Sequence, residues 1–169
     1  MKKILALVLC MLMAVSLAAA ASAEDVWHLG ILVHSLDNEF WAQEANGGIL
    51  FAESKDDVEY QVLTTDGDDN KENQAMKDFI AQYGDKCIFV ADPASKANTA
   101  NIVEICEEAG CKVTILWHHA DDLEPADFDS FVCHMSHDDF VAGYNTAKYL
   151  FDRLGGKGKV CALYGMQGE

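Results

Sequence analysis

Short apolar runs alternate with amphipathic helical segments along most of the chain, and this alternation limits the possible folds more than any other feature. The runs are short enough for buried strands and lie at 26–33, 58–64, 87–91, 113–117, 130–135 and 160–164. Between them, apolar residues recur at helical spacing around 41–52, 70–83, 98–109 and 138–154. The alternation predicts right-handed βαβ units, and therefore an α/β fold in which helices cover both faces of a parallel sheet.

Side chains suited to ligand binding follow several of the predicted strands. Ligands of open parallel sheets bind at the carboxyl ends of the strands, near the point where the strand order reverses. Aromatic rings can stack on the C–H faces of a sugar, while carboxylates, amides and imidazoles bind its hydroxyl groups. We therefore predict a sugar-type site, whose candidate residues are His34, Asn38, Phe40, Trp41, Asp92, Trp117 and His118. Phe40 and Trp41 are adjacent on a helix, so we expect one of the two to be a plain core residue.

The first 23 residues have the features of an export signal. Lys2 and Lys3 precede an apolar stretch that ends in Ala21-Ser22-Ala23, and acidic residues follow directly. Signal peptidase accepts small residues at the first and third positions before the cleavage site, which are Ala23 and Ala21 here. A membrane anchor is the alternative, and a lipid anchor at Cys10 is disfavoured by the bulky Leu9. The expected location is the periplasm or the extracellular space, with no membrane insertion after cleavage.

The charge balance excludes two classes of partner. The sequence has 12 Lys and Arg against 28 Asp and Glu, a net charge of −16. Cleavage after Ala23 would remove two lysines and no acid, giving 10 − 28 = −18. Nucleic acids and anionic membrane surfaces both need basic side chains, so neither is expected as a partner.

Five cysteines remain beyond the predicted signal, and an odd number cannot all pair internally. Each lies in or beside an apolar run, so we interpret them as small buried hydrophobic residues. A Cys106–Cys111 disulfide across a helix end is the alternative.

Metal binding and catalysis have weak support in the sequence. A zinc site would draw on histidines and acids that lie near one another in the sequence, namely His118, His119, His134, His137, Asp121, Asp122, Asp138 and Asp139. His134 and His137 straddle a predicted strand end, and Asp138 and Asp139 suit the first turn of a helix. The sequence also lacks a Gly-x-Ser-x-Gly elbow, a phosphate loop and a Gly-x-Gly-x-x-Gly turn. We predict no metal, no cofactor and no enzymatic activity.

Three motifs resemble the sugar-binding periplasmic proteins of ABC importers, the ribose-binding-protein-like group. They are Gly-Ile-Leu-Val-His-Ser-Leu-Asp-Asn-Glu-Phe-Trp at 30–41, Phe-Val-Ala-Asp-Pro at 89–93 and Phe-Asp-Arg-Leu-Gly-Gly-Lys-Gly-Lys-Val at 151–160. The resemblance implies two α/β lobes that close on a sugar. Residues 24–129 would form the first lobe, and residues 130–169 the hinge crossing and the start of the second. It also implies that the chain is a fragment of a reading frame about twice as long.

The resemblance assigns roles to individual residues. Phe40 and Trp41 match the family's aromatic pair, Asn38 an Asn before that pair, and His34 a polar residue at the strand end. Asp92 stands where the family usually has Asn before Pro.

The sequence also departs from the family pattern. Trp117 and His118 replace the Asp-Arg of ribose binders, which argues against ribose itself. Glu39 stands where Pro is common. His137 and Asp138 align with a stretch at the start of the second lobe and are possible contacts from that side.

The expected function is a monomeric, non-catalytic receptor that captures a sugar or polyol and delivers it to an ABC permease. One alternative is a sensor of the same fold that serves a chemotaxis or two-component receptor. Another is an exported metal-binding or enzymatic α/β protein. Neighbouring permease and ATPase genes would favour the receptor.

Overall fold

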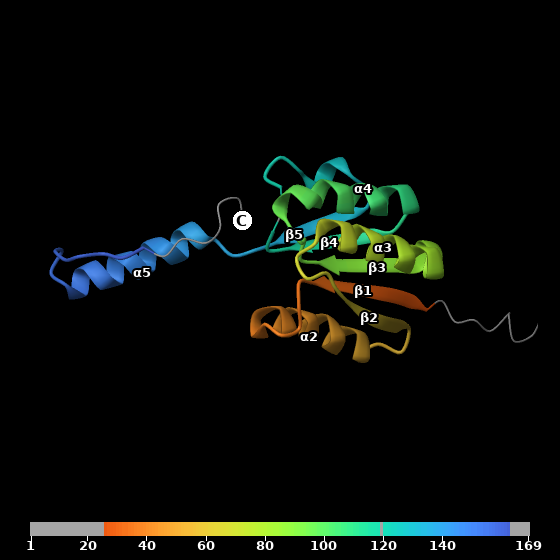
Figure 1. The fold of residues 1–169 in the computed structure, drawn as a ribbon, viewed down its shortest axis with the longest axis horizontal. Coiled ribbons are helices and arrows are strands. Elements are labelled where there is room, and N and C mark those ends of the chain that lie inside the picture. Colours follow the sequence, from red (N-terminus) through yellow and green to blue (C-terminus); the bar gives the residue numbers. More distant parts are fainter. Residues whose placement is uncertain (1–25, 119, 163–169) are drawn as a thin grey trace, which may run out of the picture.

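The structure is a computed structural model, and it describes residues 26–118 and 120–162. Five parallel strands form one sheet in the order β2-β1-β3-β4-β5 (Figure 1). The strands are β1 (Trp27–Val33), β2 (Val58–Thr64), β3 (Cys87–Ala91), β4 (Lys112–Leu116) and β5 (Phe131–Met135). The α-helices are α2 (Glu39–Glu53), α3 (Asp69–Tyr83), α4 (Thr99–Ala109) and α5 (Asp139–Arg153), and short 3-10 turns lie at Gly84–Lys86, Lys96–Asn98 and Pro125–Asp127.

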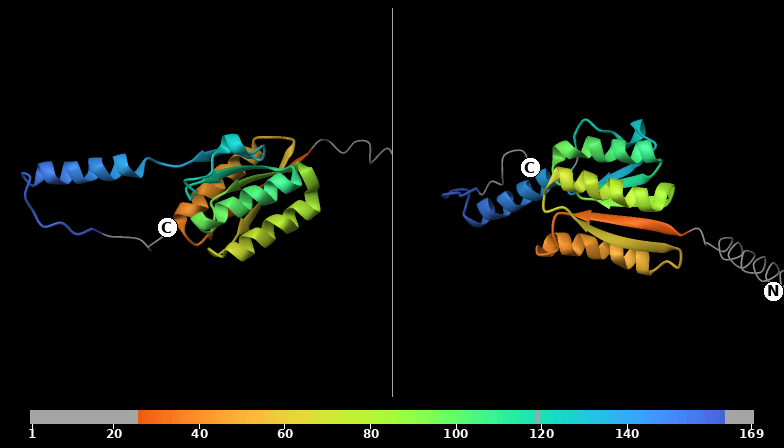
Figure 2. Two further views of the ribbon diagram at one scale, coloured as in Figure 1. Left: turned by 90° about the horizontal axis from the view of Figure 1, so that it is seen from above. Right: turned by 45° about the vertical axis from the view of Figure 1, so that its right-hand side comes forward.

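The sheet lies between two helical layers, as the alternation predicts. Helix α2 covers one face, and α3 with α4 covers the other (Figures 1 and 2). Successive residues of a strand point to opposite faces, so β1 serves both cores. Leu29, Ile31 and Val33 pack in the core on the α2 side, whereas Leu32 packs in the core with α3 and α4.

Local sequence signals set the helix ends. The Asn38 side chain accepts a hydrogen bond from the Phe40 N–H and caps α2, and Asp68 caps α3 by accepting from Asn70 and Lys71. Gly84 and Gly110 follow α3 and α4 with positive φ angles of 67° and 71°, which ends each helix.

Helix α5 does not cover the sheet. It stands away from the other elements in Figures 1 and 2, and none of its residues is buried. The large apolar residues that recur along it at helical spacing are exposed, with Phe140 82% exposed. Helix α5 belongs to the segment 130–169, for which the family resemblance implies the hinge crossing and the start of a second lobe, and not to the helical layers on this sheet.

The predicted last strand is also not formed within the described residues. Residues 160–162 have no regular secondary structure, and residues 163 and 164 lie outside the described part of the chain.

The cysteines correct a second expectation. Cys87, Cys106 and Cys111 are buried as predicted, but Cys133 is half-buried and Cys161 is exposed. All five are free thiols, so the Cys106–Cys111 disulfide is not formed. Cys111 instead donates from Sγ to the backbone oxygen of Gly84 at 3.5 Å.

None of the helices in the described part of the chain has the length and apolar character that a membrane span requires.

We predict that Gly30→Ala lowers the free energy of unfolding by about 1–3 kcal/mol, because it overpacks the core. A Cβ at Gly30 would lie 2.6 Å from two ring carbons of Phe89. Gly47→Ala is the matched control on an exposed face of α2, where a Cβ meets nothing within 4 Å. This change should leave stability unchanged or raise it by up to about 1 kcal/mol. Urea unfolding of both variants measures the difference, and equal effects would contradict this packing.

Thiol labelling of the folded protein should separate the cysteines. Burial raises the pKa of Cys87 to about 12 and also raises those of Cys106 and Cys111, which leaves little reactive thiolate. We expect Cys161 to react with a maleimide at least about tenfold faster than these three. In denaturant all should react alike. Equal rates in the folded protein, read by peptide mass spectrometry, would show that the three thiols are not buried.

Candidate functional site

The carboxyl ends of the three central strands bring the candidate residues together. His34 follows β1, Asp92 follows β3, and Trp117 with His118 follows β4. Strand β1 pairs with β2 on one side and β3 on the other, so the strand order reverses between β1 and β3. Phe40 and Trp41 lie in the first turn of α2, directly after β1. The geometry is that of a ligand site at a topological switch point.

Asp92 is the centre of this arrangement. Its side chain is fully buried, with 0% of its surface exposed. The indole Nε1–H of Trp41 donates to Oδ2 at 2.9 Å, and the Nδ1–H of His118 donates to Oδ1 at 2.8 Å. The backbone N–H of His118 also faces Oδ1, at 3.5 Å. Asp92 therefore ties together α2, the end of β3 and the end of β4.

Three rings stack above this carboxylate. His34 stacks on Trp41 with ring centroids 4.5 Å apart and an interplanar angle of 19°. The His118 ring also stacks on His34, with ring centroids 5.5 Å apart. His34 Nε2 lies 2.9 Å from the backbone oxygen of Pro93. A carbonyl only accepts, so this nitrogen carries the proton, and the ring is held in one orientation.

Glu72 of α3 holds the loop that follows Asp92. Glu72 is fully buried and accepts from the Ala94 N–H at 2.9 Å and the Asn98 side chain at 2.8 Å. Burial raises the pKa of Glu72 to about 7, while these two hydrogen bonds act in the opposite direction. A second buried acid thus holds the backbone on which Asp92 and Pro93 are placed.

A cavity of about 400 Å³ opens above the ring stack and is lined by His34, Phe40, Trp41, Trp117 and His118. Phe40 and Trp117 meet edge to face with centroids 5.5 Å apart. In the described part of the chain, no Asp, Glu, Lys or Arg side chain lines this cavity. Its walls offer aromatic faces and imidazole nitrogens, which suit a small ligand with both apolar and hydroxyl-bearing surfaces.

Trp117 has an unusual backbone conformation. Its φ angle is 48°, in the left-handed region that a bulky residue rarely adopts. Such strain costs about 1–3 kcal/mol and persists only where the surroundings enforce it. Here the Trp117 N–H donates to the Met135 oxygen at 3.0 Å, and the ring packs between Phe40 and His137.

A second cavity, of about 220 Å³, also has Trp117 in its wall and is lined by Glu44, Leu116, Trp117, Met135, Ser136 and His137. Glu44 lies one turn after Phe40 and Trp41 on α2. Its pKa is raised to about 7, first by burial and then by the charge of Asp92, while His118 lowers it. A hydrogen bond between the Glu44 and Asp92 side chains adds to the increase.

Five of the predicted site residues line one cavity, and the others lie elsewhere. Asn38 is exposed, and its Oδ1 is engaged as the helix cap. Asp92 lies beneath the rings rather than in the cavity wall. His137 lines the second cavity, and Asp138 caps α5 by accepting from the Val141 N–H at 2.9 Å.

The expectation about Phe40 and Trp41 holds in part. Trp41 packs on the core beneath α2 and also lines the cavity, while Phe40 is 44% exposed. Sequence reasoning missed Glu44. Glu44 lies four residues after Phe40 and three residues after Trp41, which places it on the same helical face. This spacing is the sequence signal that could have identified it.

The described residues hold one compact group of potential metal ligands, His34, Asp92 and His118, whose ligand atoms lie within 4.8 Å of one another. This group shares only His118 with the histidine cluster that the sequence suggests. Both Asp92 oxygens already accept hydrogen bonds, and His34 Nε2 is bonded to Pro93. The group is thus satisfied as a hydrogen-bonded network.

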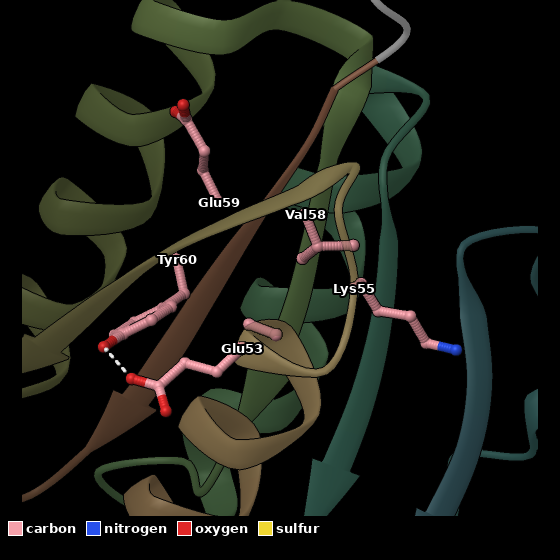
Figure 3. A pocket seen from close by; sticks show the side chains of 6 residues that line it. Glu53, Lys55, Val58, Glu59 and Tyr60 are labelled. Carbon is pink, nitrogen blue, oxygen red and sulfur yellow. Dashed lines mark hydrogen bonds between the residues drawn. The ribbon is translucent and has the colours of Figure 1, made fainter.

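Another hollow, of about 380 Å³, lies at the opposite edge of the sheet, where α2 ends and β2 begins (Figure 3). The Tyr60 hydroxyl donates to Glu53 Oε1 at 3.1 Å, while Lys55 and Glu59 point in different directions (Figure 3). Because its polar groups do not converge, this hollow is a poor candidate for a binding site.

Comparisons with known proteins agree with the fold. The chain is 27% identical over 170 residues to the ribose import binding protein RbsB of Haemophilus influenzae, which covers 99% of this chain and 54% of that protein. The chain therefore spans about half the length of this curated relative.

Solved structures show the same likeness. A twin-arginine translocation pathway signal protein from Burkholderia phytofirmans matches with a TM-score of 0.73 and 33% identity, over 79% of this chain and 41% of that one. The fructose-binding periplasmic domain of a hybrid two-component system shares the fold, with a TM-score of 0.57 and 20% identity, over 78% of this chain and 41% of that one. The family model described as a periplasmic binding protein domain matches residues 29–169. This chain is a member of that periplasmic binding protein family.

Proposed function

We propose that the chain is the ligand-binding part of an exported, non-catalytic receptor for a sugar or polyol. The observation that supports this most directly is the aromatic cavity above Asp92 at the topological switch point. Phe40 and Trp117 offer ring faces for the C–H groups of a sugar, and His34 and His118 offer ring nitrogens for its hydroxyls. The ribose import role of the Haemophilus relative supports the same class of ligand.

In this proposal Asp92 positions other residues and does not bind a hydroxyl itself. It is fully buried, and both oxygens are engaged by Trp41 and His118. Asn38 likewise acts on the ligand indirectly, by fixing the first turn of α2, on which Phe40 and Trp41 lie.

The mechanism we propose is closure of two lobes on the ligand. Residues 24–129 form the first lobe, and residues 130–169 form the hinge crossing and the start of the second. The separation of α5 from the sheet supports a boundary within this second segment, because β5 at its start still pairs with β4 in the sheet of the first lobe (Figure 2). A ligand that contacts both lobes favours the closed form by the difference between its affinities for the two forms. His137 and Asp138, at the start of α5, are possible contacts from the second side.

We further propose that residues 1–23 are removed on export and that the loaded, monomeric receptor delivers its ligand to an ABC permease. The sensor role is the second candidate, and the fold shared with a domain of a two-component system supports it. Deleting the gene separates the two roles. Loss of ligand uptake indicates transport, whereas normal uptake with loss of a ligand-induced transcriptional response indicates sensing.

A fluorescence titration tests the binding proposal, because Trp41 and Trp117 both line the cavity. The protein, expressed from its complete reading frame, is titrated with pentoses, hexoses and polyols. We expect a saturable change with at least one of them. Phe40→Ala should weaken that affinity about tenfold, or about 1.4 kcal/mol, because it removes one aromatic wall.

The matched control is Tyr60→Phe, in the hollow at the opposite edge of the sheet (Figure 3). It should leave the affinity unchanged. No saturable change with any sugar or polyol would contradict the proposed function. Weakening by Tyr60→Phe but not by Phe40→Ala would place the site elsewhere.

A further inference from the structure

The second cavity adjoins the proposed sugar site at Trp117. On one side the Trp117 ring meets Phe40, with centroids 5.5 Å apart, and on the other it meets His137, with centroids 5.7 Å apart. The 400 Å³ and 220 Å³ cavities both have Trp117 in their walls. A ligand whose ring lies in the larger cavity could therefore extend a substituent past Trp117 toward Glu44.

Glu44 has an unsatisfied oxygen at this place. Its Oε2 is shielded from solvent and has no hydrogen-bond partner among the described residues. A shielded carboxyl oxygen without a partner destabilises the folded protein, so such groups normally meet a ligand or an ordered water. An oxygen of this kind accepts, and the missing partner must be an O–H or N–H donor.

The charges around Glu44 favour a cationic donor over a neutral one. Asp92 faces it from the end of β3, His118 from the end of β4, and His137 from the segment before α5. In the described part of the chain, neither cavity is lined by lysine or arginine. Two carboxyl groups without a Lys or Arg partner are complementary to a positive ligand group, and a charge-assisted hydrogen bond is about twice as strong as a neutral one.

We propose that the ligand is an amino sugar or amino polyol, whose ammonium group enters the cavity behind Trp117 and donates to Glu44 Oε2. The inference rests on the proposed function, because the sugar ring or polyol chain occupies the adjoining aromatic cavity. The ammonium group pairs with the ionised form of Glu44, so the fraction of Glu44 that is protonated releases its proton on binding.

The test compares each neutral probe with its amine counterpart. The protein is titrated with glucose against glucosamine and with sorbitol against glucamine, followed by tryptophan fluorescence or calorimetry. We expect the amine to bind at least tenfold more tightly than its neutral partner at pH 7.5. Glu44→Gln should reduce this preference to within about twofold. Glu53→Gln, at the other end of α2 and outside both cavities, is the matched control and should retain the preference.

The pH dependence of the unmodified protein gives a second readout that needs no variant to fold. The pKa of Glu44 is about 7, so the carboxylate is present at pH 8 and mostly protonated at pH 5.5. Glucamine keeps its alkyl ammonium charge at both values, as lysine does. Its advantage over sorbitol should therefore fall about tenfold or more between pH 8 and pH 5.5.

The outcomes separate the two proposals. Equal binding of both members of each pair would overturn the amine inference and leave the sugar or polyol receptor standing. An amine preference that Glu44→Gln does not reduce, or that does not fall at pH 5.5, would overturn the assignment to Glu44. No binding of any probe would overturn the amine inference, and silence across the wider panel of sugars would overturn the proposed function as well.

Discussion

The buried carboxylate of Asp92 is the interaction on which the site depends. A carboxylate without solvent is costly unless donors surround it, and here the donors are two of the rings that line the aromatic cavity. Trp41 arrives from α2 and His118 from the end of β4, and each gives Asp92 a hydrogen bond shorter than 3 Å. Loss of Asp92 would leave two buried or half-buried N–H groups without their acceptor. The same bonds that satisfy the acid therefore fix the walls of the cavity.

The sheet makes this arrangement possible. Parallel pairing of β1, β3 and β4 places the ends of three strands at one edge, although they are far apart in sequence. The reversal of strand order leaves space between α2 and the later helices, and the aromatic cavity occupies that edge. Glu72 holds the adjacent loop from the α3 side, so the positions of Asp92 and Pro93 are set from both layers.

Much of the fold could be predicted from the sequence, because the spacing of the apolar residues and the residues at the element ends indicate the same boundaries. The strands at 58–64 and 87–91 have the predicted bounds, and Asp68, Gly84 and Gly110 lie at helix ends, where residues of these types are common. Helix α5 was harder to place. Its apolar face indicates a partner surface, but the pattern of a single helix does not say whether that surface is the sheet of the same lobe.

The site was predictable only at the level of which residues gather at the strand ends. The sequence brings His34, Phe40, Trp41, Trp117 and His118 to one edge, and the structure places them around one cavity. The direction of each side chain decides the rest, and sequence does not give it. Asp92 turns inward to its donors, Asn38 turns back to its helix, and Glu44 enters the site because it lies on the same helical face as the aromatic pair.

The most direct test of the role of Asp92 is hydrogen exchange of the Trp41 indole N–H. The exchange is followed by NMR in the unmodified protein and in the Asp92→Ala and Asp92→Asn variants. The account predicts that the indole N–H of Trp41 exchanges at least about tenfold more slowly than that of an exposed tryptophan, and that both substitutions speed its exchange. Exchange as fast as in an exposed tryptophan, or protection that both substitutions leave intact, would contradict the central role of Asp92.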